Sequence, residues 1–182
     1  HMNNKPLRQS GFTLVELMVV IVIVGILASL IVLNISGVDQ RKAMQAREFF
    51  LLDLQRINRE ATDQGRILAL ATLPQTDVRP FGYQILEYIE PSAQTVIQAN
   101  NKWQVYKDLP VRSLPANVSF QIRPVDYDYR AASNQDLVGQ QAPQLVWLGN
   151  GEVKPVRIQF YSAQTPVGAE IEVDHLGKIN EN

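Results

Sequence analysis

The sequence contains no cysteine and only two histidines. Without cysteine, disulfide bonds, thiol chemistry and cysteine-ligated metal sites are excluded, so a folded domain must be stabilised by packing alone. His1, together with Met2, looks like the remnant of an expression tag. His175 stands alone in a turn-like stretch, where we expect it to be solvated. One histidine offers neither a Ser-His-Asp set nor a histidine-based metal site.

Motifs for enzymatic chemistry are also missing. No G-x-S-x-G, phosphate-binding loop or H-E-x-x-H pattern occurs. Asp126 and Asp128 stand close together in the polar stretch Pro124–Pro143, but the spacing, glycine and glutamate of a calcium-binding EF-hand are absent. We therefore expect a polar surface loop there, and a protein that is not an enzyme and has no cofactor, no metal and no small-molecule substrate.

The charges give no global field, because 17 basic and 18 acidic residues leave a net charge of −1. A nucleic-acid receptor would need a basic strip. Five cations between residues 41 and 59 could form such a strip. Carboxylates are interspersed with these cations, so we expect the charged side chains to be solvated on a helix surface and not to bind a nucleic acid. The cations are Arg41, Lys42, Arg47, Arg56 and Arg59, and the carboxylates are Glu48, Asp53, Glu60 and Asp63.

Proline is missing between Pro6 and Pro74, which permits one long helix in the first part of the chain. Apolar residues beyond position 40 recur at spacings of three and four, which predicts an amphipathic helix with one buried stripe. Gly65 is a natural C-cap. Weak helix propensity near Ser36 and Gly37 predicts a bend or a melted turn. The stripe consists of Ala43, Ala46, Phe50, Leu54, Ile57 and Ala61.

The longest apolar run extends from Phe12 to Leu33 and contains one charge, Glu16. A helix of these twenty-two residues is about 33 Å long and matches a bilayer core. The run is longer than the apolar part of a cleavable secretory signal and is not followed by an A-x-A site. Lys5 and Arg8 precede it, so the positive-inside rule keeps the N-terminus in the cytoplasm and exports the remainder. A plain signal anchor is the alternative interpretation.

Glu16 is the residue that a plain anchor does not explain. An acid at mid-bilayer costs about 2.5–3.5 kcal/mol even on lenient scales, and less near an interface, so an intramembrane carboxylate is a functional hypothesis that needs a partner. If the chain were cleaved before Phe12, the new α-amine of Phe12 would be such a partner.

Short apolar runs separated by Pro, Gly, Asn and Asp follow Gly65, and they predict an antiparallel β domain. Trp103 and Trp147 lie in two of these runs, and we expect them to pack in the core. Leu148–Glu152 and Asp174–Gly177 are expected to form tight turns. The runs are Ile67–Leu73, Phe81–Ile89, Trp103–Tyr106, Val118–Ile122, Leu145–Leu148, Val156–Tyr161 and Ala169–Val173.

The sequence GFTLVE, with basic residues before it and a long apolar run after it, resembles the class III signal of type IV pilins and type II secretion pseudopilins. The resemblance implies that a prepilin peptidase cleaves after Gly11 and methylates the new N-terminus at Phe12. It also implies that Glu16 pairs with the N-terminal amine of a neighbouring subunit during filament assembly.

The remaining chain is similar to the H-type minor pseudopilins of type II secretion systems, the GspH family. FGYQI and above all PQLVWLGNGEVKP, Pro143 to Pro155, carry this similarity. The function that it implies is to link the tip complex of a pseudopilus to its shaft and to support export of folded proteins across the outer membrane. The alternative is a type IV pilus minor pilin of the FimT/FimU group, which could bind DNA; many of those carry a disulfide.

Together these observations predict an α+β fold, in which a long N-terminal helix packs on a C-terminal antiparallel β-sandwich-like domain. We expect a leader at 1–11, a transmembrane helix at 12–33, a periplasmic half-helix at 34–65 and the β domain at 66–182. The resemblance implies a single-pass protein of the bacterial inner membrane with a cytoplasmic N-terminus and a periplasmic C-terminal domain. Its implied partners are prepilin peptidase and other minor and major pseudopilins; nucleic-acid binding is disfavoured.

Overall fold

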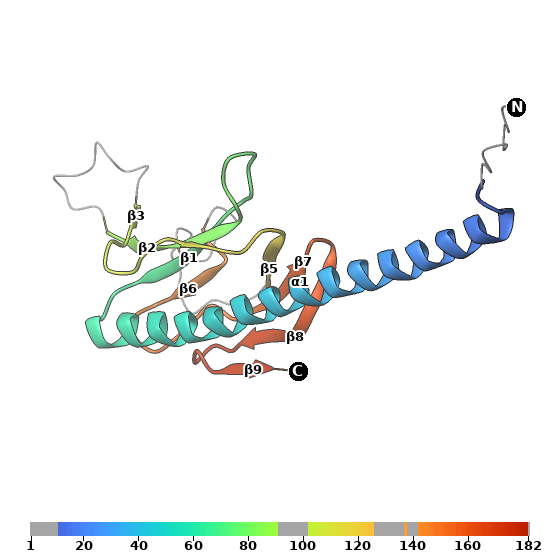
Figure 1. Cartoon of the computed structure of the whole chain (residues 1–182). Helices are drawn as coiled ribbons and strands as arrows, with labels where there is room; N and C mark the ends of the chain where they lie inside the picture. Colours follow the sequence, from blue (N-terminus) through green and yellow to red (C-terminus); the bar gives the residue numbers. More distant parts are fainter. Residues whose placement is uncertain (1–10, 91–101, 126–136, 138–141, 182) are drawn as a thin grey trace, which may run out of the picture. The chain divides into compact units, whose positions relative to one another are not determined.

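The computed structural model describes residues 11–90, 102–125, 137 and 142–181, with the side chains of 33–36 excepted. The chain divides into two compact units, His1–Val38 and Asp39–Asn182. One helix, α1 (Leu14–Gln64), contributes residues to both units (Figure 1). The leader residues Lys5 and Arg8 lie outside the described residues, as do Asp126 and Asp128.

Helix α1 continues through Ser36 and Gly37, so the expected melted turn is wrong. The lack of proline within α1 leaves its chain of backbone hydrogen bonds uninterrupted, and two residues of weak propensity do not break it. The expected bend stays a prediction. The helix ends at Gly65 as expected, where φ is +61° and the amide of Arg66 donates to the carbonyl of Ala61 at 3.0 Å.

In the first unit, the large apolar side chains of α1 face solvent on all sides. Their exposed fractions run from 37% at Val38 to 77% at Leu14. The most apolar 18-residue window of α1 has a mean hydropathy of 3.0, and none of it is buried. A core helix of a soluble protein buries this much apolar surface, whereas a membrane helix leaves it to lipid. The segment is long and apolar enough to cross a membrane, a property that signal sequences share.

The second unit contains a five-stranded antiparallel sheet in the order β3-β2-β1-β6, with β4 also paired to β2. Leu70 of the central strand is opposite Ile85 on one side and Leu145 on the other, so one face of this sheet is apolar. The strands are β1 (Leu68–Leu73), β2 (Gly82–Tyr88), β3 (Trp103–Val105), β4 (Arg112–Ser113) and β6 (Leu145–Trp147).

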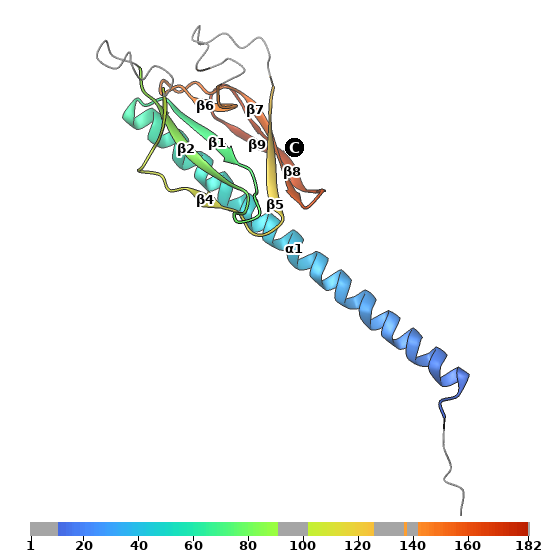
Figure 2. The same ribbon diagram turned by 90° about the horizontal axis from the view of Figure 1, so that it is seen from above.

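A second antiparallel sheet has the order β5-β7-β8-β9 (Figure 2). Its strands are β5 (Val118–Pro124), β7 (Val156–Ser162), β8 (Thr165–Val173) and β9 (Ile179–Glu181). All seven predicted apolar runs form strands, whereas β4 and β9 were not predicted. Glycines with positive φ at Gly149, Gly151 and Gly177 confirm both predicted turns.

The predicted stripe of α1 is buried along its whole length, with exposed fractions from 0% to 9%. Phe50 lies at its centre. The Phe50 ring is 5.3 Å from Tyr83 of β2, 4.7 Å from Phe120 of β5 and 5.2 Å from Phe160 of β7, between ring centroids. The helix stripe therefore joins the two sheets in a single hydrophobic core, and the core residues all belong to the second unit.

Phe50→Ala is expected to lower the free energy of unfolding by about 3–5 kcal/mol, because it removes the ring that contacts both sheets and leaves a cavity. Phe49→Ala is the matched control: its ring is 47% exposed, and a loss below about 1 kcal/mol is expected. Denaturant unfolding of the full chain in detergent, followed by fluorescence of the buried Trp147, measures both. Equal losses for the two variants would contradict this assignment of the core.

Candidate functional site

The start of α1 is shaped by Thr13, the residue immediately before the helix. Its hydroxyl accepts the amide of Glu16 at 3.2 Å, and its carbonyl accepts the amide of Leu17 at 3.1 Å. Glu16 is the third helical residue, so Thr13-x-x-Glu16 has the spacing of a capping box. The sequence reasoning did not single out Thr13, although the [ST]-x-x-[DE] pattern before an apolar run would have identified it.

Glu16 lies in the first turn of α1 and is exposed. The positive end of the helix dipole stabilises a carboxylate at this place. Within the described part of the chain, no hydrogen bond or ion pair engages the Glu16 carboxylate, while its amide is held by Thr13. The carboxylate is therefore held in a defined turn and remains able to bind a cation from outside this chain.

Gly11 and Phe12 precede α1 in an exposed segment without regular secondary structure. A Cβ atom built on Gly11 would meet nothing within 4 Å, so the fold itself does not require glycine here. Phe12 is 83% exposed. Non-helical, accessible backbone is the form in which a peptidase can bind a chain, and these two residues present it directly before the helix.

Arg47, one of the five cations that we expected to be solvated on the helix, is buried with 3% exposure, so that expectation is wrong for this residue. Its Nη2 donates to the carbonyl oxygen of Ala169 at 2.8 Å, and its Nη1 donates to Glu181 Oε1 at 2.8 Å. A buried guanidinium needs such partners. Arg47 thereby connects α1 to β8 and β9 and is not available to a nucleic acid.

Asp53 is the other buried charged residue of the described chain, with 9% exposure. Its Oδ2 accepts the hydroxyl of Tyr83 at 2.5 Å and Nε of Arg112 at 3.1 Å. Burial, together with this hydrogen bond, raises the pKa of Tyr83, so the phenol stays neutral. The three residues connect α1 to β2 and β4. Because every group has a partner inside the protein, we interpret the set as structural.

Tyr106, like Tyr83, donates its hydroxyl to a carboxylate of α1. Its hydroxyl donates to Glu60 Oε1 at 2.7 Å, and burial raises its pKa. Nearby, the hydrogen bond from Arg66 to Glu87, at 2.6 Å, raises the pKa of Arg66. These contacts hold the C-terminal end of α1 against the first sheet and give no group poised to exchange protons near neutral pH.

Three other residues that the sequence singled out, Trp103, Trp147 and His175, lie in the described part of the chain. Trp147 is buried in the core with 2% exposure, as predicted. Trp103 is only half-buried and does not belong to the hydrophobic core, so the prediction is wrong for this residue. Its ring packs against Tyr88, with ring centroids 5.3 Å apart. His175 is exposed in the turn before β9. Among the described residues, no group of three or more His, Cys, Asp or Glu side chains could hold a metal ion.

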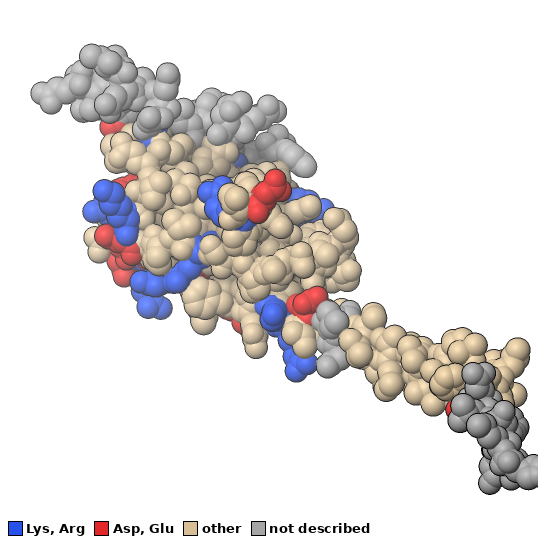
Figure 3. Space-filling view, turned by 45° about the horizontal axis from the view of Figure 1, so that its top comes forward, with Lys and Arg blue, Asp and Glu red and all other residues tan. Residues whose placement is uncertain are grey.

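The surface charges of the described residues lie in small mixed groups on the face that Figure 3 shows, with Asp and Glu next to Lys and Arg. Ion pairs among the described residues also join opposite charges, as between Arg66 and Glu87 and between Arg123 and Glu170. The fields of neighbouring opposite charges largely cancel at distances greater than their separation, and salt screens exposed charges beyond about 10 Å. This face therefore offers no continuous basic surface for a nucleic acid.

Comparison with known proteins identifies the N-terminal segment first. Residues 6–32 match the family described as "Prokaryotic N-terminal methylation motif". The type II secretion system core protein G of Aeromonas hydrophila is 44% identical over 94 residues, which cover 46% of this chain and 64% of that protein. The chain thus matches less than two thirds of the length of this relative.

Similarity over most of the chain is to a different group. Type II secretion system protein H of Klebsiella michiganensis is 23% identical over 186 residues, covering 95% of each chain, and that of Aeromonas hydrophila is 26% identical over 184 residues, covering 94% of this chain and 92% of the relative. These matches confirm the resemblance to H-type proteins that was predicted from Pro143–Pro155.

A solved structure supports the fold class. The minor pseudopilin EPSH from the type II secretion system of Vibrio cholerae matches with a TM-score of 0.51 at 19% identity, covering 78% of this chain and 94% of that chain. The prediction of a long N-terminal helix followed by antiparallel sheets is confirmed.

Proposed function

We propose that the chain is a minor pseudopilin of a type II secretion system. Its N-terminal segment matches a methylation motif, and its sequence is similar to H proteins over most of its length. One observation carries the proposal: a carboxylate, Glu16, lies in the first turn of an apolar helix that is exposed on all sides. The α+β unit that follows in the sequence, residues 39–182, supports the H-type assignment.

In this proposal Gly11–Phe12 is the processing site. Prepilin peptidase cleaves after Gly11, which removes the leader 1–11, and methylates the amine of Phe12. The non-helical backbone and the open space around Gly11 support this role, because the peptidase can bind the segment without unfolding any element.

Glu16 is the assembly contact. A carboxylate within lipid carries a cost that a cationic partner removes. The amine of Phe12 on a neighbouring subunit is such a partner, since methylation leaves it protonated. Pairing between neighbours would bring their apolar helices side by side, and packing against other helices would then replace contact with lipid.

The remaining assignments follow the same proposal. The apolar helix anchors the chain in the bacterial inner membrane, with its N-terminus in the cytoplasm and residues 34–182 in the periplasm. The partners are prepilin peptidase and the major and minor pseudopilins, and the role is to connect the tip complex with the shaft. No catalysis, cofactor or small-molecule substrate enters this function.

The pilus alternative is weaker on two observations. H proteins match over more than nine tenths of the chain. A DNA-binding strip would lose Arg47, which is buried against Ala169. Salt-sensitive DNA binding by the full chain at low ionic strength would favour the alternative.

The test of the proposed function is photo-cross-linking in the native envelope, with a photoreactive residue placed at exposed positions of the second unit such as Leu52 or Leu176. We expect the cross-linked proteins, identified by mass spectrometry, to be pseudopilins of a type II secretion system. Cross-links to type IV pilus subunits only would support the alternative, and cross-links to neither class would contradict both.

A further inference from the structure

The turn Leu148–Glu152 contains the only Asn-Gly pair of the sequence, Asn150-Gly151. The turn joins β6 to Val153, which forms a bridge with Trp147. Asn150 is exposed, and neither it nor Gly151 belongs to a helix or a strand. We call this segment the Asn150 turn. Because a side-chain amide here precedes a residue without a Cβ atom, the main-chain nitrogen of that residue can reach the side chain.

The main-chain nitrogen of Gly151 is open to attack the Asn150 side chain. Gly151 has a φ of +94°, and a Cβ atom built on it would meet nothing within 4 Å. Within the described part of the chain, no hydrogen bond occupies the Gly151 amide. A peptide nitrogen that has lost its proton is a nucleophile, and a side chain on the same residue would obstruct its approach to the carboxamide. Neither a hydrogen-bond partner nor a side chain obstructs this nitrogen.

The Asn150 side chain is held and polarised by the same turn. Its Oδ1 accepts the amide of Glu152 at 2.9 Å. The ring of atoms that this hydrogen bond closes includes the Gly151 nitrogen, so the carboxamide carbon stays near that nitrogen. An N–H aimed at a carbonyl oxygen also stabilises the negative charge that develops on the oxygen when the carbon is attacked. The bond length lies within the range of about 2.7–3.1 Å that such donors have.

We propose that Asn150 is a site of spontaneous deamidation and isomerisation in the folded protein. The Gly151 nitrogen loses its proton to hydroxide and bonds to Cγ of Asn150, and Nδ2 leaves as ammonia. The product is a cyclic imide, a succinimide, in which the Gly151 nitrogen is bonded both to Cγ and to the main-chain carbonyl carbon of residue 150.

Water then opens the succinimide in one of two ways. Cleavage of the bond between nitrogen and Cγ gives aspartate with an ordinary main chain. Cleavage of the bond between nitrogen and the main-chain carbonyl carbon gives isoaspartate, in which the main chain runs through Cβ and Cγ. Either route consumes one water molecule, releases one ammonia molecule and involves no oxidation or reduction. Residue 150 gains a negative charge in both products.

These products alter a turn that packs closely against the end of α1. A Cβ atom built on Gly149 would lie 2.8 Å from the carbonyl oxygen of Arg66, two residues after the helix. Both products place a carboxylate at residue 150, beside Glu152 and near the negative end of the helix dipole. Isoaspartate also adds one atom to the main chain, so the hydrogen bond from the Leu148 amide to the Glu152 carbonyl, at 2.9 Å, cannot keep its geometry.

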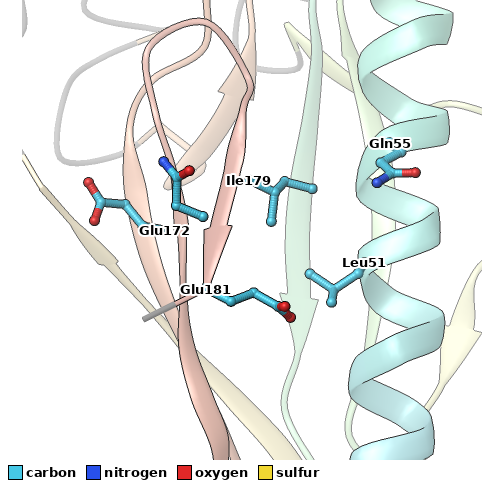
Figure 4. Close-up of a pocket in the computed structure, with 6 residues that line it drawn as sticks. Leu51, Gln55, Glu172, Ile179 and Glu181 are labelled. Atoms are coloured by element: carbon cyan, nitrogen blue, oxygen red, sulfur yellow. The ribbon is translucent and has the colours of Figure 1, made fainter.

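The Asn150 turn is connected to β9 through one main-chain hydrogen bond. Val153, directly after the turn, donates its amide to the carbonyl of His175 at 2.9 Å, in the turn before β9. Figure 4 shows β9 beside α1, with Glu181 across a groove from Leu51. We therefore expect isoaspartate to loosen both the Asn150 turn and the segment that leads into β9.

Ageing of the purified full chain in detergent at mildly alkaline pH tests the site. Deamidation raises the mass of a peptide by about 1 Da, and fragmentation locates the change and distinguishes aspartate from isoaspartate. Asn117 is the internal control, because it lies in an exposed turn with a φ of +65° but precedes the β-branched Val118. We expect Asn150 to deamidate at least about tenfold faster than Asn117. Equal rates at the two asparagines, or no change at Asn150, would overturn the proposal.

Asn150→Gln tests the attack by the neighbouring nitrogen. It retains a side-chain amide but moves this amide one methylene further from the main chain. We expect the rate at residue 150 to fall by at least about tenfold, because the reacting atoms no longer meet in the favoured ring. A glutamine that deamidated as fast as Asn150 would exclude attack by the Gly151 nitrogen.

Two substitutions of Glu152 test the role of its amide. Glu152→Gln removes the charge and keeps the N–H, whereas Glu152→Pro removes the N–H. We expect Glu152→Gln to deamidate as the unaltered chain does. Glu152→Pro should be about two- to tenfold slower, which is the effect of one hydrogen bond. Equal rates for the two variants would remove the activating role from this amide.

Hydrogen exchange measures the structural consequence. Asn150→Asp is the matched control for the isoaspartate form, since it has the new charge without the additional main-chain atom. We expect the amides of Leu148 and Val153 to exchange faster in the isoaspartate form than in Asn150→Asp, and the amides of β7 to exchange equally in both. Equal exchange at Leu148 and Val153 would contradict the expected loosening of the turn.

Discussion

Replacing Gly11 by valine is expected to leave the leader attached in cells that contain an active prepilin peptidase. The structure supplies no reason for glycine at this position, because an added Cβ would meet nothing within 4 Å. Any requirement must then come from the peptidase pocket, where one extra methylene already costs about 10–200-fold in catalytic efficiency. We expect processing to fall by at least about tenfold for Gly11→Ala and further for Gly11→Val.

The control for this prediction is Gly25→Ala. Gly25 lies in the apolar part of α1, and its added Cβ also meets nothing within 4 Å. This variant should be processed as the unaltered chain is, because it lies outside the motif GFTLVE. Immunoblots that separate leader-bearing and mature forms measure all three variants. Identical mobility of the Gly11 variants and the unaltered mature chain would remove the processing role from Gly11.

Glu16→Ala is expected to be processed normally and to assemble poorly. Removal of the carboxylate leaves the amine of a neighbouring Phe12 in an apolar environment without a counter-charge. Truncation of one partner of a buried charge pair costs about 2–5 kcal/mol, which corresponds to at least about a 30-fold loss of association. Cross-linking to neighbouring subunits, normalised to the amount of mature protein, measures this loss.

Glu16→Gln separates charge from local structure. The amide of residue 16 would still donate to the Thr13 hydroxyl, as it does at 3.2 Å in the unaltered chain, so the start of α1 is preserved. We expect Glu16→Gln to assemble nearly as poorly as Glu16→Ala. If Glu16→Gln assembled normally, the role of Glu16 would lie in capping the helix and not in pairing with an amine.

The sequence predicted those features of the fold that arise from local periodicity. The buried stripe around Phe50 was correct in every member, because a spacing of three and four residues places side chains on one helix face. The seven apolar runs became strands because turn residues bound each run and alternate side chains of a strand face the core. Strands β4 and β9 were missed because Arg112–Ser113 contains no apolar residue and Ile179–Glu181 contains only one, so neither forms an apolar run.

The burial of Arg47 and Asp53 could not be predicted from the sequence. Arg47 was expected among solvated cations, yet it is bound by Ala169, more than a hundred residues away. Asp53 likewise depends on Tyr83 and Arg112. Residue type alone predicts exposure for both, and only tertiary contacts reverse it. Thr13 differs, because its capping-box spacing with Glu16 can be read in the sequence itself.

Processing after Gly11 requires that the mature protein begin at Phe12, with a methylated amine four residues before Glu16. Intact-mass measurement of the full chain, purified from membranes of cells that contain prepilin peptidase, tests it most directly. We expect a mass that lacks residues 1–11 and includes one additional methyl group, located on Phe12 by fragmentation. A purified chain that retains the leader, or that begins at any other residue, would contradict it.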